Sequence, residues 1–154
     1  AVLSPTVSHP RVECETLGSE RLLVVAPGDG PLDVPADLTL GELRKHPRIS
    51  LSGVHCLGQQ IEHFCSRHRL AGELACHARQ LDTVFELVRL GLGVSLVPEM
   101  AARRRPSDGL RFARLRRPVP RRAIGLATRV GRSRSLLADR FAALLELEVG
   151  TRGG

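Results

Sequence analysis

Short apolar runs alternate with amphipathic stretches along the chain, and polar turns separate them. Strands are expected at Arg21–Ala26, Arg48–Leu51, Glu73–Ala78, Val94–Val97, Leu110–Leu115 and Arg122–Thr128. Helices are expected from Thr39 to before Pro47, at Cys56–His68, at Leu81–Leu90, after Pro98 and at Ser135–Leu147. Because strands alternate with helices, the sequence predicts an α/β fold with a largely parallel sheet.

Specific residues mark the boundaries of two of these helices. Thr39 is followed three residues later by Glu42, which is the spacing of a capping box. The segment Leu81–Leu90 carries apolar residues on one helical face and is followed by Gly91. We expect Gly91 to end that helix, because glycine adopts the left-handed conformation common at helix C-termini.

The composition is that of a chain that folds around an aliphatic core. The 154 residues suffice for one domain or two small lobes, and 42% of them are hydrophobic. Aromatic residues make up only 3%, so Leu, Val, Ile and Ala must fill the core. No apolar run approaches the roughly 18 residues of a membrane helix, and Ala1–Pro10 lacks the pattern of a secretory signal. We expect no membrane partner and a cytoplasmic location.

The formal net charge is +7, and nearly all basic residues are arginines because Lys45 is the only lysine. Many of the arginines lie in the C-terminal third: Arg103, Arg104, Arg105, Arg111, Arg114, Arg116, Arg117, Arg121, Arg122, Arg129, Arg132 and Arg134. Such a segment can face nucleic acid, but aromatic stacking partners and a nucleic-acid-binding motif are absent. Such a cluster of arginines more commonly forms a surface that is solvated or paired with acidic residues.

Four cysteines occur without any C-x-x-C pair, which favours free thiols in a reducing compartment. We expect Cys14 and Cys76 to be core residues. A metal site is an open alternative for the cluster His55, Cys56, His63, Cys65 and His68, but the cluster lacks the paired spacing of structural zinc sites. We therefore expect neither a metal nor another cofactor.

The segment Leu81–Pro98, LDTVFELVRLGLGVSLVP, resembles effector domains of LysR-type transcription regulators, where a helix ends at G-x-G and a strand ends in L-x-P. The later residues Pro120–Arg122, Ile124–Leu126 and the helix Ser135–Leu147 continue the match. The resemblance implies a two-lobed fold like that of periplasmic binding proteins, incomplete at its N-terminus. It places residues 1–25 and 129–154 in lobe I and residues 26–128 in lobe II.

The segment Gly53–Cys65, GVHCLGQQIEHFC, is similar to the redox segment of the OxyR-type peroxide sensors within that family. By this resemblance Cys56 is the peroxide-reactive cysteine and Cys65 the resolving one. His55 and Arg122 match residues that support the reactive thiol. One departure is that Gly58-Gln59 replaces the charged pair that usually follows the C-L dipeptide.

The resemblance implies a regulator and not an enzyme. Hydrogen peroxide would be sensed through a reversible Cys56–Cys65 disulfide that reshapes the domain and alters transcription. The implied partners are further copies of the chain, as dimers or tetramers, and promoter DNA. DNA would be bound only through a helix-turn-helix domain that we expect upstream of Ala1, in a longer polypeptide.

The spacing of the two cysteines constrains how they can react. Nine residues of helix span about 13.5 Å and place Cys56 and Cys65 on opposite sides, whereas a disulfide tolerates a Cα separation of about 7 Å at most. Forming the bond must therefore disrupt the helix. Cys56 at the helix start is also where the helix dipole favours a thiolate, the form that attacks peroxide.

Three other functions stay open. The chain can be a LysR-type domain that binds a small organic effector between its lobes, with cysteines that have no redox role. It can be a thiol peroxidase, which has less need of helix disruption and which an incomplete domain disfavours. A cysteine hydrolase needs a histidine and an acid near Cys56, and no motif supplies them.

Overall fold

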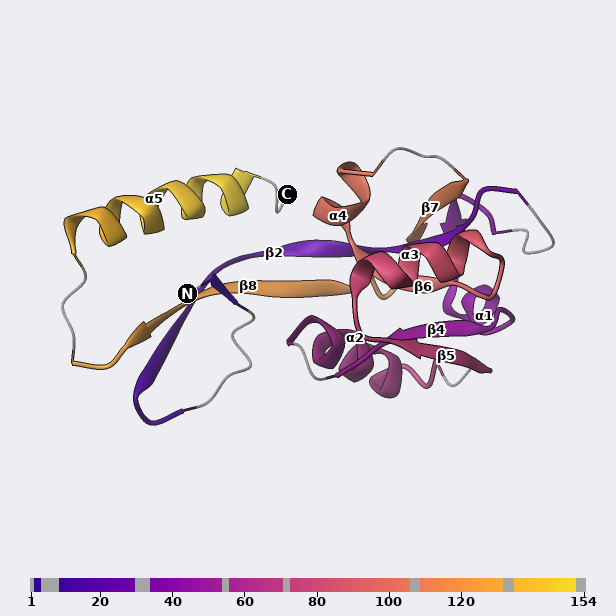
Figure 1. Ribbon diagram of the computed structural model, residues 1–154, viewed down its shortest axis with the longest axis horizontal. Coiled ribbons are helices and arrows are strands. Elements are labelled where there is room, and N and C mark those ends of the chain that lie inside the picture. Colours follow the sequence, from indigo (N-terminus) through magenta and orange to yellow (C-terminus); the bar gives the residue numbers. More distant parts are fainter. Residues whose placement is uncertain are drawn as a thin grey trace. The chain divides into compact units, whose positions relative to one another are not determined.

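The computed structural model describes residues 2–3, 9–29, 34–53, 56–70, 73–105, 109–131 and 135–151 (Figure 1). The strands are β1 (Val2–Leu3), β2 (Val12–Pro27), β3 (Asp37–Leu38), β4 (Arg48–Leu51), β5 (Leu74–Ala78), β6 (Ser95–Pro98), β7 (Leu110–Leu115) and β8 (Arg121–Arg129). The helices are α1 (Leu40–Leu43), α2 (Cys56–Arg67), α3 (Leu81–Arg89), α4 (Glu99–Arg103) and α5 (Leu136–Thr151). Within these described ranges, no helix has the length and apolarity needed to cross a bilayer.

The chain divides into two compact units. Unit 1 comprises Ala1–Glu20 and Arg121–Gly154, and unit 2 comprises Arg21–Pro120. The long strand β2 contributes its first part to unit 1 and its second part to unit 2. The units thus change at 20/21 and 120/121, while the lobe boundaries expected at 25/26 and 128/129 remain a prediction.

The sheet of unit 2 is mixed, so the expectation of a largely parallel sheet was wrong. Strand β2 runs antiparallel to both of its neighbours in this unit, β6 and β7. Parallel pairs occur further out, between β3 and β7 and between β4 and β5. A parallel bridge between Arg48 and Val94 joins β4 to the residue before β6. The α/β class was predicted correctly, but β2 reverses the direction at the centre of the sheet.

The core of unit 2 is built almost entirely from Leu, Val, Ile and Ala, as the composition predicts. Phe85 of α3 is its one fully buried aromatic side chain among the described residues. The ring of Phe85 meets that of Phe112 edge to face at 6.3 Å between centroids, and the Arg105 guanidinium lies 4.4 Å from the Phe85 centroid. Because α3 and α2 both pack against β4 (Figure 1), this core reaches the helix that carries the cysteine pair.

Both predicted helix boundaries are confirmed. The Thr39 hydroxyl accepts from the Glu42 N–H, and a Glu42 carboxylate oxygen accepts from the Thr39 N–H at 2.7 Å, which completes the capping box. Gly91 follows α3 with φ +77°. Its N–H donates to the Val88 carbonyl, and the Leu92 N–H donates to the Leu87 carbonyl, which is the Schellman pattern.

Unit 1 contains the first part of β2, strand β8 next to it, and β1 paired antiparallel with β8. Helix α5 of this unit has apolar residues at helical spacing, as predicted, yet several are largely exposed. The exposed large apolar residues of α5 are Leu136, Leu137, Phe141, Leu144 and Leu147. Val149 of the same helix is buried and lies against the backbone at Gly18.

Candidate functional site

Cys56 and Cys65 lie on the same helix in unit 2. Cys56 is the first residue of α2 and is half-buried, whereas Cys65 lies near the end of α2 and is only 3% exposed. Both are free thiols. The helix predicted for this segment is thus confirmed, and the two thiols are nine residues apart within it. His55, the residue expected to assist Cys56, lies outside the described residues.

The first turn of α2 lies directly against the end of β4. A Cβ atom at Gly58 would be 2.1 Å from the carbonyl oxygen of Ser52 and 2.9 Å from that of Leu51. No side chain fits there, which gives a physical reason for Gly58 where OxyR-type sequences usually carry a charged residue. Glycine therefore fixes how closely the turn that carries Cys56 approaches the strand.

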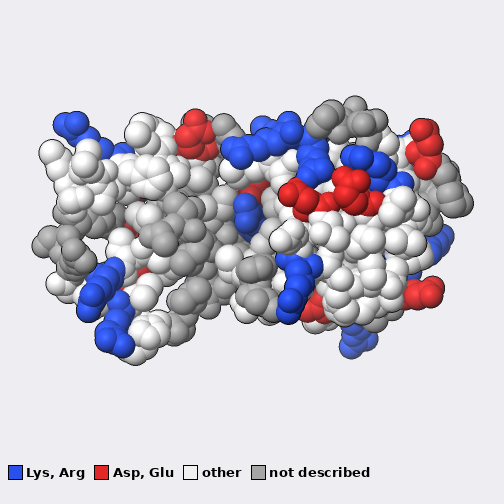
Figure 2. Space-filling model, in the orientation of Figure 1, with Lys and Arg blue, Asp and Glu red and all other residues white. Residues whose placement is uncertain are grey.

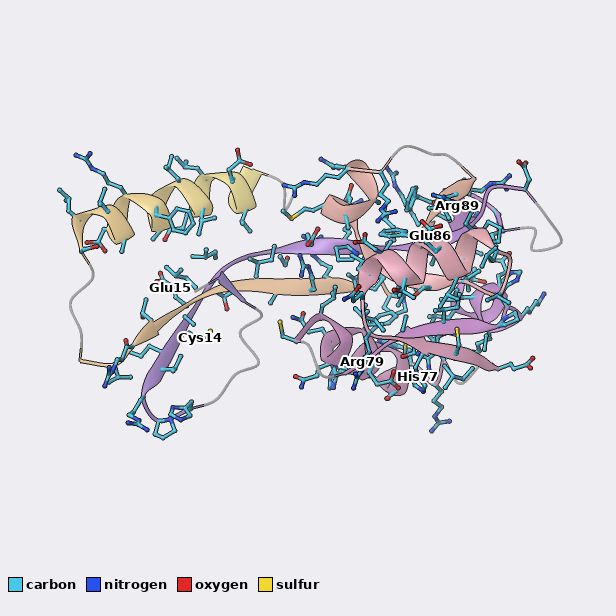
Figure 3. The ribbon with its side chains drawn as sticks, in the orientation of Figure 1. Cys14, Glu15, His77, Arg79, Glu86 and Arg89 are labelled. Atoms are coloured by element: carbon cyan, nitrogen blue, oxygen red, sulfur yellow. The ribbon has the colours of Figure 1, made fainter. Side chains whose placement is uncertain are left out.

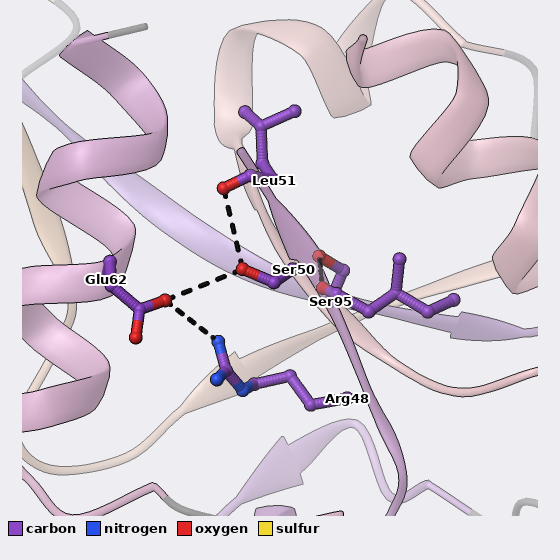
Figure 4. Close-up of polar contacts among 6 residues, drawn as sticks. Arg48, Ser50, Leu51, Glu62 and Ser95 are labelled. Carbon is purple, nitrogen blue, oxygen red and sulfur yellow. Dashed lines mark hydrogen bonds and ion pairs between the residues drawn. The ribbon is translucent and has the colours of Figure 1, made fainter. Parts of the chain in front are cut away.

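A polar cluster joins the middle of α2 to β4 (Figure 4). The Arg48 Nη1 donates to the Glu62 Oε2 at 3.3 Å, and the Ser50 hydroxyl donates to the same oxygen at 3.5 Å. Arg48 and Ser50 alternate with Ile49 and Leu51 along β4, so the two pairs face opposite sides of the strand. One face of β4 is thus polar and faces α2, while the other belongs to the apolar core.

Cys65 shares its surroundings with this cluster. It lines a cavity of about 20 Å³ together with Arg48, Ser95 and His46, among others. Within the described part of the chain, the Nε atom of Arg48 is buried and has no hydrogen-bond partner. Burial raises the pKa of the Cys65 thiol, and the Glu62 carboxylate acts in the same direction. The charge and hydrogen bonding of Arg48 lower that pKa but do not cancel the rise.

The two thiols differ in their access to solvent. Cys56, at the helix start, is the more accessible to a small solute. Cys65 is sequestered, and its raised pKa keeps it a neutral thiol at physiological pH. Thiolates are the nucleophiles in reactions with peroxide and with sulfenic acids. Cys65 is therefore a poor nucleophile as long as it keeps these buried surroundings.

Arg122 lies in unit 1, where its guanidinium forms an ion pair and a hydrogen bond with the Glu20 carboxylate. Glu20 is 4% exposed, so the pair is largely buried. Cys56 belongs to unit 2. The expectation that Arg122 assists the reactive thiol stays a prediction, and the pairing with Glu20 is a role that the sequence did not indicate.

The remaining candidate residues have less specific surroundings. Cys14 on β2 (Figure 3) and Cys76 on β5 are half-buried rather than buried, although Cys76 packs against the core. Among the described residues, no three His, Cys, Asp or Glu side chains are grouped so that they could hold a metal ion. His55, a member of the expected metal cluster, is not among them.

Several arginines of the basic segment are paired with acids. Arg103 binds Glu99 at 2.8 Å, and Arg105 pairs with both Asp82 and Glu86. Glu86 also forms an ion pair with Arg89 of α3, with 3.3 Å between Oε2 and Nη1 (Figure 3). The face in Figure 2 accordingly shows acidic side chains among the basic ones over unit 2. These contacts favour a structural role for this part of the segment.

The sequence did not single out Arg48, Ser50 and Glu62 as a cluster. The alternation of polar and apolar residues in Arg48–Leu51 was the available signal, because it indicates a strand with one polar face. The spacing could not show that Glu62 would lie opposite the polar face of this strand. Glu62 is recognised as the partner only once the packing of α2 on β4 is known.

A family model described as the LysR substrate binding domain matches residues 1–149. A probable hydrogen peroxide-inducible genes activator of Streptomyces viridosporus is 33% identical over 147 residues, which are 94% of this chain and 47% of that protein. The chain thus spans about half the length of this curated relative.

Two solved structures show the same architecture. The Corynebacterium glutamicum OxyR C206 mutant matches with a TM-score of 0.81 at 30% identity, over 99% of this chain and 48% of that one. The effector binding domain of QuiR in complex with shikimate matches with a TM-score of 0.78 at 19% identity, over 98% of this chain and 71% of that one. The second likeness shows the fold alone.

Proposed function

Because the chain belongs to the LysR substrate binding domain family, we propose that it is the sensing part of a transcription regulator and detects hydrogen peroxide through Cys56 and Cys65. Relatives named as hydrogen peroxide-inducible activators or OxyR, about 30% identical, support peroxide as the signal. Promoter binding would be the work of another part of the polypeptide. The protein would act as a dimer or tetramer in the cytoplasm.

The proposed chemistry has two steps. In the first, the Cys56 thiolate attacks one oxygen of hydrogen peroxide, the O–O bond breaks, and the departing hydroxide takes up a proton to become water. Cys56 is then a sulfenic acid. In the second, the Cys65 thiolate attacks the Cys56 sulfur and expels hydroxide, which leaves a disulfide and a second water.

One observation carries this proposal: both cysteines lie on the single helix α2. Nine residues of intact helix hold them about 13.5 Å apart along the axis, well beyond the reach of a disulfide, about 7 Å between Cα atoms. The second step therefore requires α2 to unwind, which would expose Cys65 and break the contact of Glu62 with β4. Oxidation of the Cys56 thiol would thereby change the conformation of α2.

The test is disulfide mapping by mass spectrometry after stoichiometric hydrogen peroxide is added to the reduced 154-residue chain. We expect a Cys56–Cys65 disulfide in the parent chain, a sulfenic acid at Cys56 in Cys65→Ser, and an unreacted Cys65 in Cys56→Ser. Cys14→Ser and Cys76→Ser are the controls and should still form the bond. Thiols that stay unmodified, together with a thermal shift on adding an organic acid, would instead support an effector-binding domain. Repeated peroxide turnover with a reductant would support a peroxidase.

A further inference from the structure

A group of arginines on one face of the unit 2 sheet surrounds a groove away from the cysteine pair. The groove has a volume of about 160 Å³. Its lining includes Arg21, Leu23, Asp37, Arg114, Arg116 and Val119, which we call the arginine groove. All six belong to unit 2.

The strand registers place these side chains together. Val25 of β2 pairs with Phe112 of β7, and side chains two residues apart share a face of a strand. Leu23 and Arg21 therefore share the face of Val25, while Arg114 and Arg116 share that of Phe112. Asp37 of β3 pairs with Arg114 and adds a carboxylate on the same face. Val25 on this face is itself buried, so the groove lies beyond it, toward Arg21 and Arg116.

The groove carries an unbalanced positive charge. The lining contains three arginines and one aspartate, so its net formal charge is 3 − 1 = +2. Within the described part of the chain, the side chains of Arg21, Arg114 and Arg116 make no hydrogen bond or ion pair. Glu42, whose pKa Arg116 helps to lower, is hydrogen-bonded to Thr39 in the capping box. The three guanidinium groups are thus available to a ligand.

We propose that the arginine groove binds a small organic dianion, with two acid groups on a short carbon skeleton. Guanidinium groups bind carboxylates and phosphates through paired hydrogen bonds, which suits a ligand with two acid groups. The groove is smaller than the roughly 300–1,000 Å³ of drug-sized ligand sites, so the ligand must be short. Leu23 and Val119 supply apolar surface for its carbon atoms. This site would bind independently of the cysteine chemistry.

The test is isothermal titration calorimetry of the reduced Cys56→Ser chain with succinate, acetate and inorganic phosphate. Succinate should bind at least ten times more tightly than acetate, and its affinity should fall as sodium chloride is raised. It should also exceed the affinity of phosphate, since phosphate has no carbon skeleton to contact the apolar walls. Because Cys56 is absent, failure of the peroxide proposal would not affect the result.

Two variants and one control locate the binding. Arg114→Gln and Arg116→Gln should each weaken succinate binding at least tenfold without lowering the melting temperature, because both side chains are exposed. Arg79→Gln, which removes an exposed charge after β5 (Figure 3), should change the affinity less than twofold. Absent binding of succinate, equal binding of acetate, preference for phosphate, or an equal loss in Arg79→Gln would each overturn the proposal.

Discussion

Glu62 of α2 forms an ion pair with Arg48 of β4, with 3.3 Å between Nη1 and Oε2. The same Glu62 oxygen accepts from the Ser50 hydroxyl, so one carboxylate connects the helix to two residues of the strand. In the proposed switch, α2 unwinds before Cys65 reaches Cys56. The contact of Glu62 with β4 then contributes to the barrier of that step.

Replacing Glu62 with glutamine should speed disulfide formation after Cys56 is oxidised. The variant loses a partly exposed ion pair, worth roughly 0.2–1 kcal/mol, and this corresponds to about a 1.4- to fivefold change in rate. It also removes a carboxylate that raises the pKa of Cys65, which acts in the same direction. The measurement is stopped-flow kinetics of disulfide formation. Glu73→Gln, an exposed acid beside β5, is the control, and an equal acceleration there would contradict the assignment.

Replacing Gly58 with alanine should destabilise the reduced protein. The new Cβ would lie 2.1 Å from the Ser52 carbonyl oxygen, so the first turn of α2 must move away from β4. Such overpacking costs about 1–3 kcal/mol. Urea unfolding measures the loss. Gly41→Ala is the matched control because its Cβ would meet only the Thr39 Oγ1 at 3.8 Å, and it should be neutral or stabilising. Equal stability of the two variants would refute the tight contact.

The raised pKa of Cys65 predicts a pH-dependent contribution to stability. The folded protein holds the Cys65 proton more tightly than the unfolded chain does, where the thiol titrates near its ordinary pKa of about 8.5. The stabilising contribution of the protonated Cys65 thiol should be complete below about pH 8.5. It should be lost as the pH rises through the pKa that Cys65 has in the folded protein. Urea unfolding of the reduced chain and of Cys65→Ala, at neutral pH and near pH 10, measures it. A stability difference that stays constant with pH would contradict the prediction.

Replacing Arg122 with glutamine should destabilise unit 1. The variant removes one cationic partner of Glu20, which is 4% exposed. Breaking a fully buried pair costs about 3–5 kcal/mol. Because the Arg122 side chain is 23% exposed, we expect a smaller loss, of about 1–3 kcal/mol. Arg121→Gln is the neighbouring control, since the exposed Arg121 side chain donates to the Ser19 hydroxyl. Thermal unfolding checks both, and an unchanged melting temperature in Arg122→Gln would be the contrary result.

Local signals predicted most elements of the fold. The strands Arg48–Leu51 and Leu110–Leu115 were placed at their observed bounds, and the capping box at Thr39 marked the start of α1. Gly91 ended α3 as expected. These features depend on neighbours in sequence, so periodicity and capping rules are enough to find them.

Features that depend on distant residues could not be predicted. The sequence indicated only the second part of β2, because Val12–Glu20 contains few large apolar residues and its first half is largely polar and exposed. The direction of β2 against β6 and β7 follows from the path of the chain and not from composition. The partners of Glu62 and Arg122, 14 and 102 residues away, likewise emerge only from the folded chain.

Hydrogen–deuterium exchange of α2, before and after oxidation with hydrogen peroxide, tests the central claim most directly. In the reduced chain, the amides in the interior of Cys56–Arg67 should be protected by helical hydrogen bonds. On oxidation they should lose protection in the parent chain and keep it in Cys65→Ser, which can oxidise at Cys56 but cannot close the bond. A Cys56–Cys65 disulfide that forms while α2 stays fully protected would contradict the account.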